Sequence, residues 1–405
     1  MSKENTFDID KLFARIFSET EKESPLDLVA LFDSKLAEYD LSKRKVLSLL
    51  NIDQRTLDDI LQGNAKQPNI INILKIAQFL EIEDLNIALV SILRNQDKEN
   101  IGSIEKAKNA SFIAKHFDIK KLSAIGFFSE TDNSDHLLQR VLTFFGYESL
   151  FQFQEELDGP LFSRTKRRHV DKMKDFWVKS AYACFKNISN QNDFDRESLK
   201  EIITKIRPYC QDVENGLLKV CRALYNVGVT VIVQNHLTLT QVRGGTFVVN
   251  NKPCIVLTDL NKRYTTIWET LLHELYHVLY DLDTIKAMKY HLTGDPDLLL
   301  IEEKAEAFSR EFFCNYENYK FIKPHINNPY MVQRFAKEVE IHPSFVYSSF
   351  RQFQQIINGK NYYGAFKEFF PDYSLAIKNL SPITWKESSL GDIATNLKSI
   401  FEIET

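Results

Sequence analysis

The chain has 405 residues, 44% of them hydrophobic, with 51 Lys and Arg against 55 Asp and Glu and a formal net charge of -4. These values are typical of a soluble globular protein and exclude a general attraction to nucleic acid, so any such binding needs a local basic patch. The polar first residues and the absence of an apolar run of about 18 residues predict neither a secretory signal nor a membrane span. Five scattered cysteines favour reduced thiols in a cytoplasmic protein.

The low content of glycine and proline, 13 and 11 residues, predicts a mostly helical chain. A short β segment after Pro208 makes the expected fold class α+β, with a small three-stranded sheet. We expect a helix-turn-helix domain over 1–95, a helical connecting domain over 104–200, a core containing the β segment over 201–325 and a helical extension over 326–405. The polar stretch 95–103 is expected to be a linker.

Residues 41–82 have the pattern of short helices joined by tight turns. Ser42 is the expected N-cap of a helix over 43–50, residues 51–53 form a turn, and a second helix covers 54–61. Gly63 ends that helix, and a further helix covers 70–80. Two short helices across a three-residue turn predict a helix-turn-helix unit.

This stretch resembles the XRE (lambda-repressor-like) DNA-binding family. The matching positions are Val46, Leu50, Ile52, Leu57, Gly63, Leu74, Ile76 and Leu80. The resemblance implies that the helix over 54–61 enters the major groove, with DNA contacts from Lys43, Gln54, Arg55 and Asp58.

Charge leaves two interpretations of this unit open. Residues 42–75 hold 6 Lys and Arg against 3 Asp and Glu, a local net of +3, whereas residues 1–100 hold 13 against 18, a net of -5. Asp58 and Asp59 on the second helix would face phosphates unfavourably. DNA binding through 42–66 is favoured, and a protein-docking module is the alternative. The basic cluster at 165–169 is expected to be a solvated surface rather than a nucleic-acid contact.

The β segment leads directly into the central motif of the chain. A helix over 217–227 ends at Gly228, and strands are expected over 229–233, 241–249 and 254–258. The next helix carries His273-Glu274-Leu275-Tyr276-His277, and Thr266 with Glu269 predicts a capping box at its start. Two further helices across a turn are expected over 328–355, and Ser389 is expected to begin the last helix.

The motif has the spacing of a zinc site. His273 and His277 lie one helical turn apart on one face, so they can supply two corners of a zinc tetrahedron. Glu274 follows the first ligand and can reach a water at the metal as a general base without becoming a ligand. The alternative is an amphipathic helix whose histidines form hydrogen bonds in the core.

A third protein ligand is needed, and the sequence offers competing carboxylates. Glu302 lies on a second helical segment, 25 residues after His277. Asp283 would require a sharp turn at Tyr280, a bulky residue that does not easily adopt positive φ. Glu303 points about 100° away from Glu302 around the helix. We favour Glu302 over both.

Residues 205–350 resemble the ImmA/IrrE metallopeptidase family. The matching segments are the strand with Gly244-Gly245, the strand Ile255-Val256-Leu257, the HELYH helix and a Glu-x-x-Ala-x-x-Phe-Ser segment that begins at Glu302. The resemblance implies that His273, His277 and Glu302 hold Zn2+, that Glu274 is the base, and that Glu306 lies near a ligand histidine. It further implies a protein substrate, such as a helix-turn-helix repressor that the enzyme cuts or inactivates.

Several functional questions stay open at this point. Tyr264 or Arg243 is a candidate for stabilising the oxyanion, and the strand over 255–257 is expected to pair with an extended substrate. The main alternative is a non-proteolytic DNA-binding regulator or antitoxin-like protein in which the metal site is structural or sensory. A latent protease restrained by its N-terminal helices is a third alternative, and a homodimer is an open assembly state.

Overall fold

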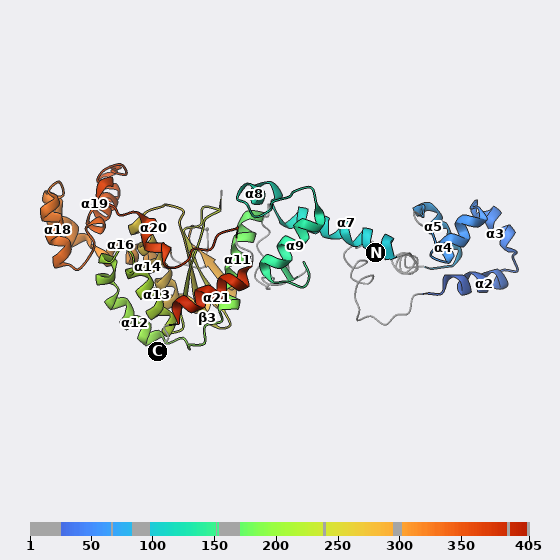
Figure 1. Ribbon diagram of the computed structural model, residues 1–405, viewed down its shortest axis with the longest axis horizontal. Coiled ribbons are helices and arrows are strands. Elements are labelled where there is room, and N and C mark those ends of the chain that lie inside the picture. The colour runs from blue at the N-terminus through green and yellow to red at the C-terminus, as the bar shows by residue number, and fades with distance from the viewer. Residues whose placement is uncertain are drawn as a thin grey trace, which may run out of the picture. The chain divides into compact units, whose positions relative to one another are not determined.

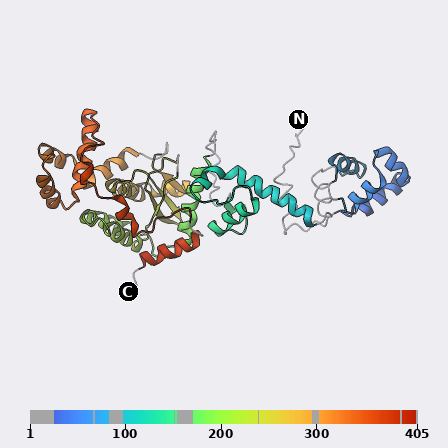
Figure 2. The same cartoon turned by 45° about the horizontal axis from the view of Figure 1, so that its top comes forward.

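The computed structural model describes residues 26–65, 68–82, 98–150, 152–153, 171–237, 240–294, 302–386 and 389–402. These residues are mostly helical with one small mixed sheet, which confirms the α+β class (Figures 1 and 2). The chain divides into two compact units, Met1–Ser111 and Phe112–Thr405. No helix within the described ranges is long and apolar enough to cross a membrane. The prediction for 165–169 lies outside the described residues.

The first unit contains the helices α2 (Leu28–Glu38), α3 (Lys43–Leu50), α4 (Gln54–Leu61) and α5 (Ile70–Phe79). Side chains cap α3 and α4 locally: Ser42 accepts a hydrogen bond from the backbone N–H of Lys45, and Asp53 accepts one from that of Thr56. Asn51, between the helices, is left-handed with φ of 49°. Because these signals are local, α3 and α4 begin and end at the predicted residues. Val46, Leu57 and Ile60 are fully buried between the helices.

The predicted linker over 95–103 is wrong in its second half, because helix α7 (Lys98–His116) begins there. Further helices follow before the sheet: α8 (Ile119–Ala124), α9 (Ser134–Phe145), α11 (Lys172–Ile188), α12 (Arg196–Lys205) and α13 (Gly216–Asn226).

The sheet has four strands, in the order β1-β3-β2-β4, where three were expected. The strands are β1 (Thr230–Gln234), β2 (Gly244–Val249), β3 (Lys252–Thr258) and β4 (Tyr290–Leu292). Strand β1 is parallel to β3, and β2 is antiparallel to both β3 and β4. Strand β4 has only three residues, too few for the alternation that marks a strand in a sequence. Since β3 has neighbours on both sides, the expected pairing of 255–257 with a substrate is wrong.

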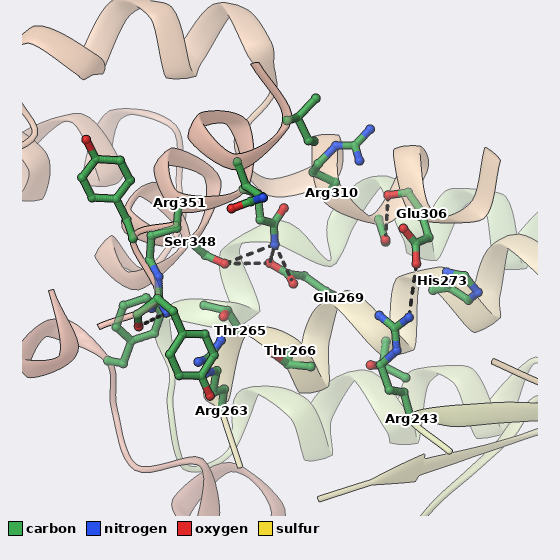
Figure 3. A pocket seen from close by; sticks show the side chains of 18 of the residues that line it. Arg243, Arg263, Thr265, Thr266, Glu269, His273, Glu306, Arg310, Ser348 and Arg351 are labelled. Atoms are coloured by element: carbon green, nitrogen blue, oxygen red, sulfur yellow. Dashed lines mark hydrogen bonds and ion pairs between the residues drawn. The ribbon is translucent and has the colours of Figure 1, made fainter. Parts of the chain in front are cut away.

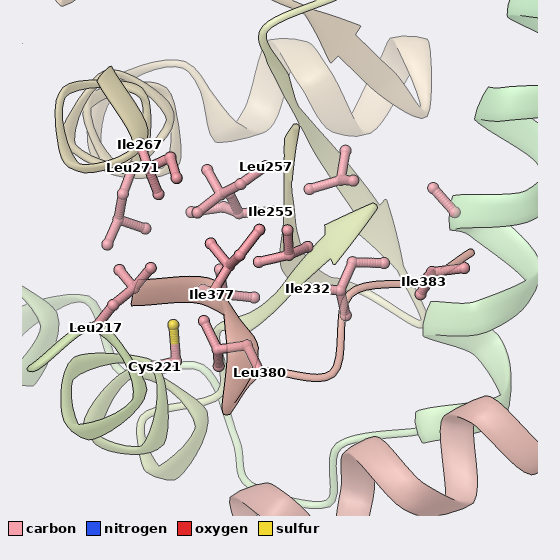
Figure 4. Close-up of a cluster of buried hydrophobic side chains, with 14 of the residues drawn as sticks. Leu217, Cys221, Ile232, Ile255, Leu257, Ile267, Leu271, Ile377, Leu380 and Ile383 are labelled. Carbon is pink, nitrogen blue, oxygen red and sulfur yellow. The ribbon is translucent and has the colours of Figure 1, made fainter. Parts of the chain in front are cut away.

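Helices cover both faces of the sheet. On one face, Ile255 and Leu257 of β3 meet Ile267 and Leu271 of α14 (Tyr264–Tyr280), in the apolar cluster of Figure 4. On the other face, Phe185 of α11 lies against Phe247 of β2, with ring centroids 5.6 Å apart. Helix α14 therefore lies directly on the sheet, and most of its residues are buried.

Helices that follow α14 complete the second unit. They are α15 (Leu282–Met288), α16 (Glu302–Phe313), α17 (Tyr316–Ile322), α18 (Pro329–Glu338), α19 (Pro343–Asn358), α20 (Tyr373–Lys378) and α21 (Leu390–Phe401). Helices α18 and α19 are the pair expected over 328–355, and Ser389 caps α21 as predicted. The five cysteines, all within the described ranges, are buried and form no disulfide.

Candidate metal centre

Helix α14 begins at Tyr264, three residues before the start that a cap at Thr266 predicts, and no side chain caps it. The predicted capping box is therefore wrong, because Thr266 already lies inside the helix. Glu269 instead accepts hydrogen bonds from Ser348 and Gln352 of α19, each at 3.0 Å. The carboxylate that looked like part of a local cap is thus bound by a helix about 80 residues further along the chain.

Three side chains converge where α14 meets α16. Nitrogen or oxygen atoms of His273, His277 and Glu302 all lie within 4.8 Å of one another, so this group could hold a metal ion. The two imidazole Nε2 atoms are 3.1 Å apart, and the Glu302 oxygens lie 3.2 Å from that of His273 and 3.4 Å from that of His277. Both imidazoles are buried, and the Glu302 side chain is 29% exposed. The grouping predicted from the spacing is thus present.

Two residues that the sequence interpretation missed hold this group in place. The Nδ1 of His277 lies 2.8 Å from the Asp281 carboxylate, one turn further along the chain. The Nε2 of His291, a buried residue in β4, lies 2.7 Å from Oε1 of Glu302. Because a histidine bonded through one ring nitrogen has a fixed ring orientation, Asp281 directs the Nε2 of His277 at His273 and Glu302.

The group is strongly coupled electrostatically. Burial would raise the pKa of the Glu302 carboxyl, but the contacts with His273, His277 and His291 hold that pKa well below its usual range. Burial would lower the pKa of His277, but Glu302, Glu274 and Asp281 together outweigh it and raise the pKa to about 9. The carboxylate is therefore ionised, as a metal ligand must be, and protons compete with a metal for the imidazole of His277.

Glu274 is fully buried beside this group. Its carboxylate accepts hydrogen bonds from the hydroxyl of Thr246 in β2, at 2.7 Å, and from the hydroxyl of Thr293, just after β4. Gly244 leaves the space for it: a Cβ at this position would lie 2.9 Å from a Glu274 oxygen and 2.6 Å from the Thr270 side chain. The sheet therefore fixes the carboxylate next to the histidines.

A cavity of about 560 Å³ is lined by Thr265, Thr266, Glu269, Thr270 and His273 of α14 (Figure 3). His273 and Thr293 line it at one end, together with Arg243. Since Thr293 also binds Glu274, the cavity reaches the hydroxyl group that touches the buried carboxylate. Of the residues in the metal group, His273 lines this cavity.

The other candidates near the motif lie elsewhere. Asp283 is exposed on α15, and Glu303 is exposed on α16. Glu306, which was expected to lie near a ligand histidine, instead forms an ion pair with Arg243 at 3.3 Å, and its side chain is 48% exposed. Asp281 is the carboxylate that contacts the Nδ1 of His277. Tyr264 is fully buried, and its hydroxyl donates to the carbonyl of Cys210 at 2.6 Å. Its hydroxyl is therefore committed to the core, which leaves Arg243 as the oxyanion candidate.

The residues predicted to contact DNA are partly paired with one another. Lys43 of α3 forms an ion pair with Asp58 of α4, so two of the four candidates neutralise each other. Arg55 is 92% exposed, with Asp59 at 3.7 Å, and Gln54 is exposed beside it. Gln54 and Arg55 are thus the two candidates whose side chains are exposed on α4 and carry no close ion pair with another candidate.

Of the missed residues, Asp281 had a usable signal, since it lies four residues after His277 on the same helical face. His291 had none, because only the pairing of β4 with β2 brings it to Glu302. No family model, curated protein or solved structure matches the chain.

Proposed function

We propose that this protein is a zinc-dependent endopeptidase with a regulatory role, of the ImmA/IrrE type, which cuts or inactivates a protein partner such as a helix-turn-helix repressor. The observation that carries the proposal is the convergence of His273, His277 and Glu302 beside a buried Glu274. Two imidazoles and one carboxylate, with a coordination position left over, are the ligand set of catalytic zinc rather than structural zinc.

The distances in the group support zinc. A tetrahedral ion with ligands at about 2.0–2.1 Å has ligand atoms roughly 3.3 Å apart. The three distances here, from 3.1 to 3.4 Å, match that edge length. Nitrogen-rich sites also accept other divalent transition metals, so zinc content has to be measured.

When bound, zinc would polarise the scissile carbonyl and lower the pKa of a water molecule. Glu274 takes a proton from the attacking water on its carboxylate and passes it to the leaving amine nitrogen. Thr246 and Thr293 orient that carboxylate, and the hydrogen bond from Thr293 gives way when the water takes its place. Arg243, at the same end of the cavity, is placed to donate to the developing oxyanion.

The test compares wild type with Glu274→Gln and with Glu303→Gln, a change at an exposed neighbour of the ligand Glu302. Substrates are purified helix-turn-helix repressors from the same genome and, independently, a proteome-derived peptide mixture. We expect one zinc per chain in all three proteins and a roughly 100- to 10,000-fold loss of cleavage in Glu274→Gln alone. Zinc-bound wild type that cleaves neither substrate would contradict the proposal.

A second function is favoured by a separate observation. Helices α3 and α4 form a folded unit with Gln54 and Arg55 exposed, and the Glu274 carboxylate is fully enclosed. These features suit a DNA-binding regulator whose metal site is structural or sensory. A specific gel shift on the promoter of its own gene, together with zinc-bound protein that does not hydrolyse, would favour this function over the peptidase.

A further inference from the structure

The end of the cavity remote from the metal group is built from arginines. At this end, Arg263 precedes α14 and Arg351 lies on α19, and both side chains line the cavity (Figure 3). Arg310 of α16 lines the cavity nearer to Glu306. Together with Arg243, four arginines face two glutamates, Glu269 and Glu306. The cavity therefore carries an excess of positive charge although the whole chain is acidic.

The two glutamates do not neutralise this remote end. Glu306 is paired with Arg243, close to the metal group. Glu269 is bound by the neutral side chains of Ser348 and Gln352, and burial raises its pKa to about 7. It is consequently only partly charged near neutral pH.

Arg263 and Arg351 contact an aromatic ring and a backbone carbonyl rather than a carboxylate. The Arg263 guanidinium lies 3.7 Å from the centroid of the Tyr363 ring, and that of Arg351 lies 5.3 Å from it. Arg351 also donates to the backbone carbonyl of Tyr363. Within the described parts of the chain, neither guanidinium has an ion pair, and the buried Nε of Arg310 has no hydrogen-bond partner.

Like charges in one small space need a compensating partner. Burial lowers the pKa of Arg351, and the neighbouring Arg263 lowers it further, while Tyr363 and Glu269 only partly oppose this shift. A planar guanidinium held against an aromatic ring keeps its outer N–H groups directed for a carboxylate. The missing partner of this pair is thus an anion that enters from the cavity.

Helix α14 fixes the distance between the two ends. Arg263 and His273 are ten residues apart, and Thr266 and Thr270 line the cavity between them. Ten residues at 1.5 Å each give about 15 Å along the axis. An extended peptide rises about 3.3 Å per residue, so roughly four to five residues span this distance.

We propose that Arg263 and Arg351 form a subsite for a carboxylate of the bound peptide, four or five residues from the bond that is cut. This inference rests on the peptidase function and names the class of substrate that the cavity accepts. The carboxylate is that of an Asp or Glu side chain, or of the peptide C-terminus. Arg310 lies in the same cavity and adds to its positive field.

The first experiment uses the full-length, zinc-loaded protein and a proteome-derived peptide mixture, with products identified by mass spectrometry. We expect Asp and Glu to be enriched four or five residues to one side of the cut bond. A synthetic peptide with the preferred sequence is then compared with its Asp→Asn form and with its C-terminally amidated form. Loss of preference in the Asn form assigns the subsite to a side chain, and loss in the amidated form assigns it to a C-terminus.

Arg263→Gln and Arg351→Gln test the residues, with Arg334→Gln on the surface of α18 as the matched control. The readout is the ratio of kcat/KM for the peptide that carries the carboxylate to that for its neutral form, which is the Asn or the amidated peptide according to the first experiment. A general loss of folding does not change this ratio. We expect a ratio of at least tenfold in wild type and Arg334→Gln, mostly through KM, and a ratio near one in the two cavity variants. Cleavage without any acidic preference, or a preference that survives both variants, overturns the subsite.

A binding measurement separates this inference from the peptidase function. Fluorescein-labelled tetra-aspartate and C-terminally amidated tetra-asparagine, which has no carboxylate, are titrated into the Glu274→Gln protein, so that the measurement needs no turnover. We expect the aspartate probe to bind at least tenfold more tightly, with the difference lost in the added Arg351→Gln or Arg263→Gln change. Equal binding of the two probes overturns the subsite, and a difference in binding without cleavage overturns only the peptidase.

Discussion

The Nδ1 of His277 lies 2.8 Å from the carboxylate of Asp281, one turn further along the chain. This contact fixes the ring so that its Nε2 points at His273 and Glu302. Asp281→Ala should therefore weaken zinc binding by about 10- to 100-fold while leaving all three ligands in place. Chelator competition measures the change. Asp283→Ala, at an exposed position two residues on, is the control, and an unchanged affinity in Asp281→Ala would contradict the role.

Gly244 is the position where the sheet comes closest to the base. Gly244→Ala places a Cβ 2.6 Å from the Thr270 side chain and 2.9 Å from a Glu274 oxygen, so the carboxylate has to move. We expect a loss of about 1–3 kcal/mol in stability, as for other overpacked sites, and a fall in kcat. Thermal unfolding and turnover are compared with those of Gly364→Ala, whose Cβ meets nothing within 4 Å. Normal turnover in Gly244→Ala would show that the close approach of Gly244 is not needed to hold the Glu274 carboxylate in its active position.

Glu269 should make stability depend on pH. Its folded pKa of about 7 lies above the ordinary value of 4.5, because burial disfavours the charged form. The neutral carboxyl therefore stabilises the fold below pH 4.5, and this contribution is lost as the pH rises through 7. Glu269→Gln keeps the hydrogen-bonding shape without the charge. Arg243, Arg263 and Arg351 are the charged groups around this carboxyl, and they limit the effect.

Chemical unfolding of metal-free protein checks this at pH 5 and pH 8. Wild type and Glu269→Gln should be alike at pH 5, and the variant should be more stable at pH 8 by roughly 2–3 kcal/mol at most. The raised pKa of His277 also removes stability between its ordinary 6.5 and about 9, but equally in both proteins. A variant that is less stable than wild type at pH 8 would mean that the Glu269 carboxylate is stabilised rather than penalised.

The pairing of Lys43 with Asp58 gives a test of DNA binding. Asp58→Asn frees the Lys43 ammonium for a phosphate, so binding should tighten and the salt slope should steepen by about one unit. Arg55→Ala should instead weaken binding by about 1–3 kcal/mol, because Arg55 is exposed on the outward surface of α4. Gel shifts on the promoter of the gene at several salt concentrations measure both. If neither variant alters the shift, α4 is not the reading helix.

Local signals in the sequence were sufficient for several elements. Ser42, Asn51 and Asp53 determine α3, the turn and α4 through contacts within three residues, so the boundaries agree with the prediction. Glu302 was also accessible, because helical periodicity and the need for a third ligand leave few carboxylates to choose from.

Features that depend on contacts between segments far apart in the chain could not be predicted from the sequence. Thr266 and Glu269 have the spacing of a capping box, but α14 begins earlier and α19 supplies the partners of Glu269. His291 reaches Glu302 only through the pairing of β4 with β2, and the central place of β3 follows from the parallel pairing with β1. Neither strand pairing produces a hydrophobic periodicity that could be recognised in the sequence.

Arg263 lies directly before α14 and His273 lies within it, so the helix fixes the distance between the arginine subsite and the metal group. A single inserted or deleted residue therefore cannot adjust this distance without also rotating one group relative to the other. One residue inserted between Arg263 and His273 would rotate the two ends by about 100° relative to each other. Only insertions near whole turns, about seven residues for two turns, would keep both groups on the cavity side. Substrate length is thus set in steps of roughly 5 Å, so relatives with a different reach should differ by whole helical turns.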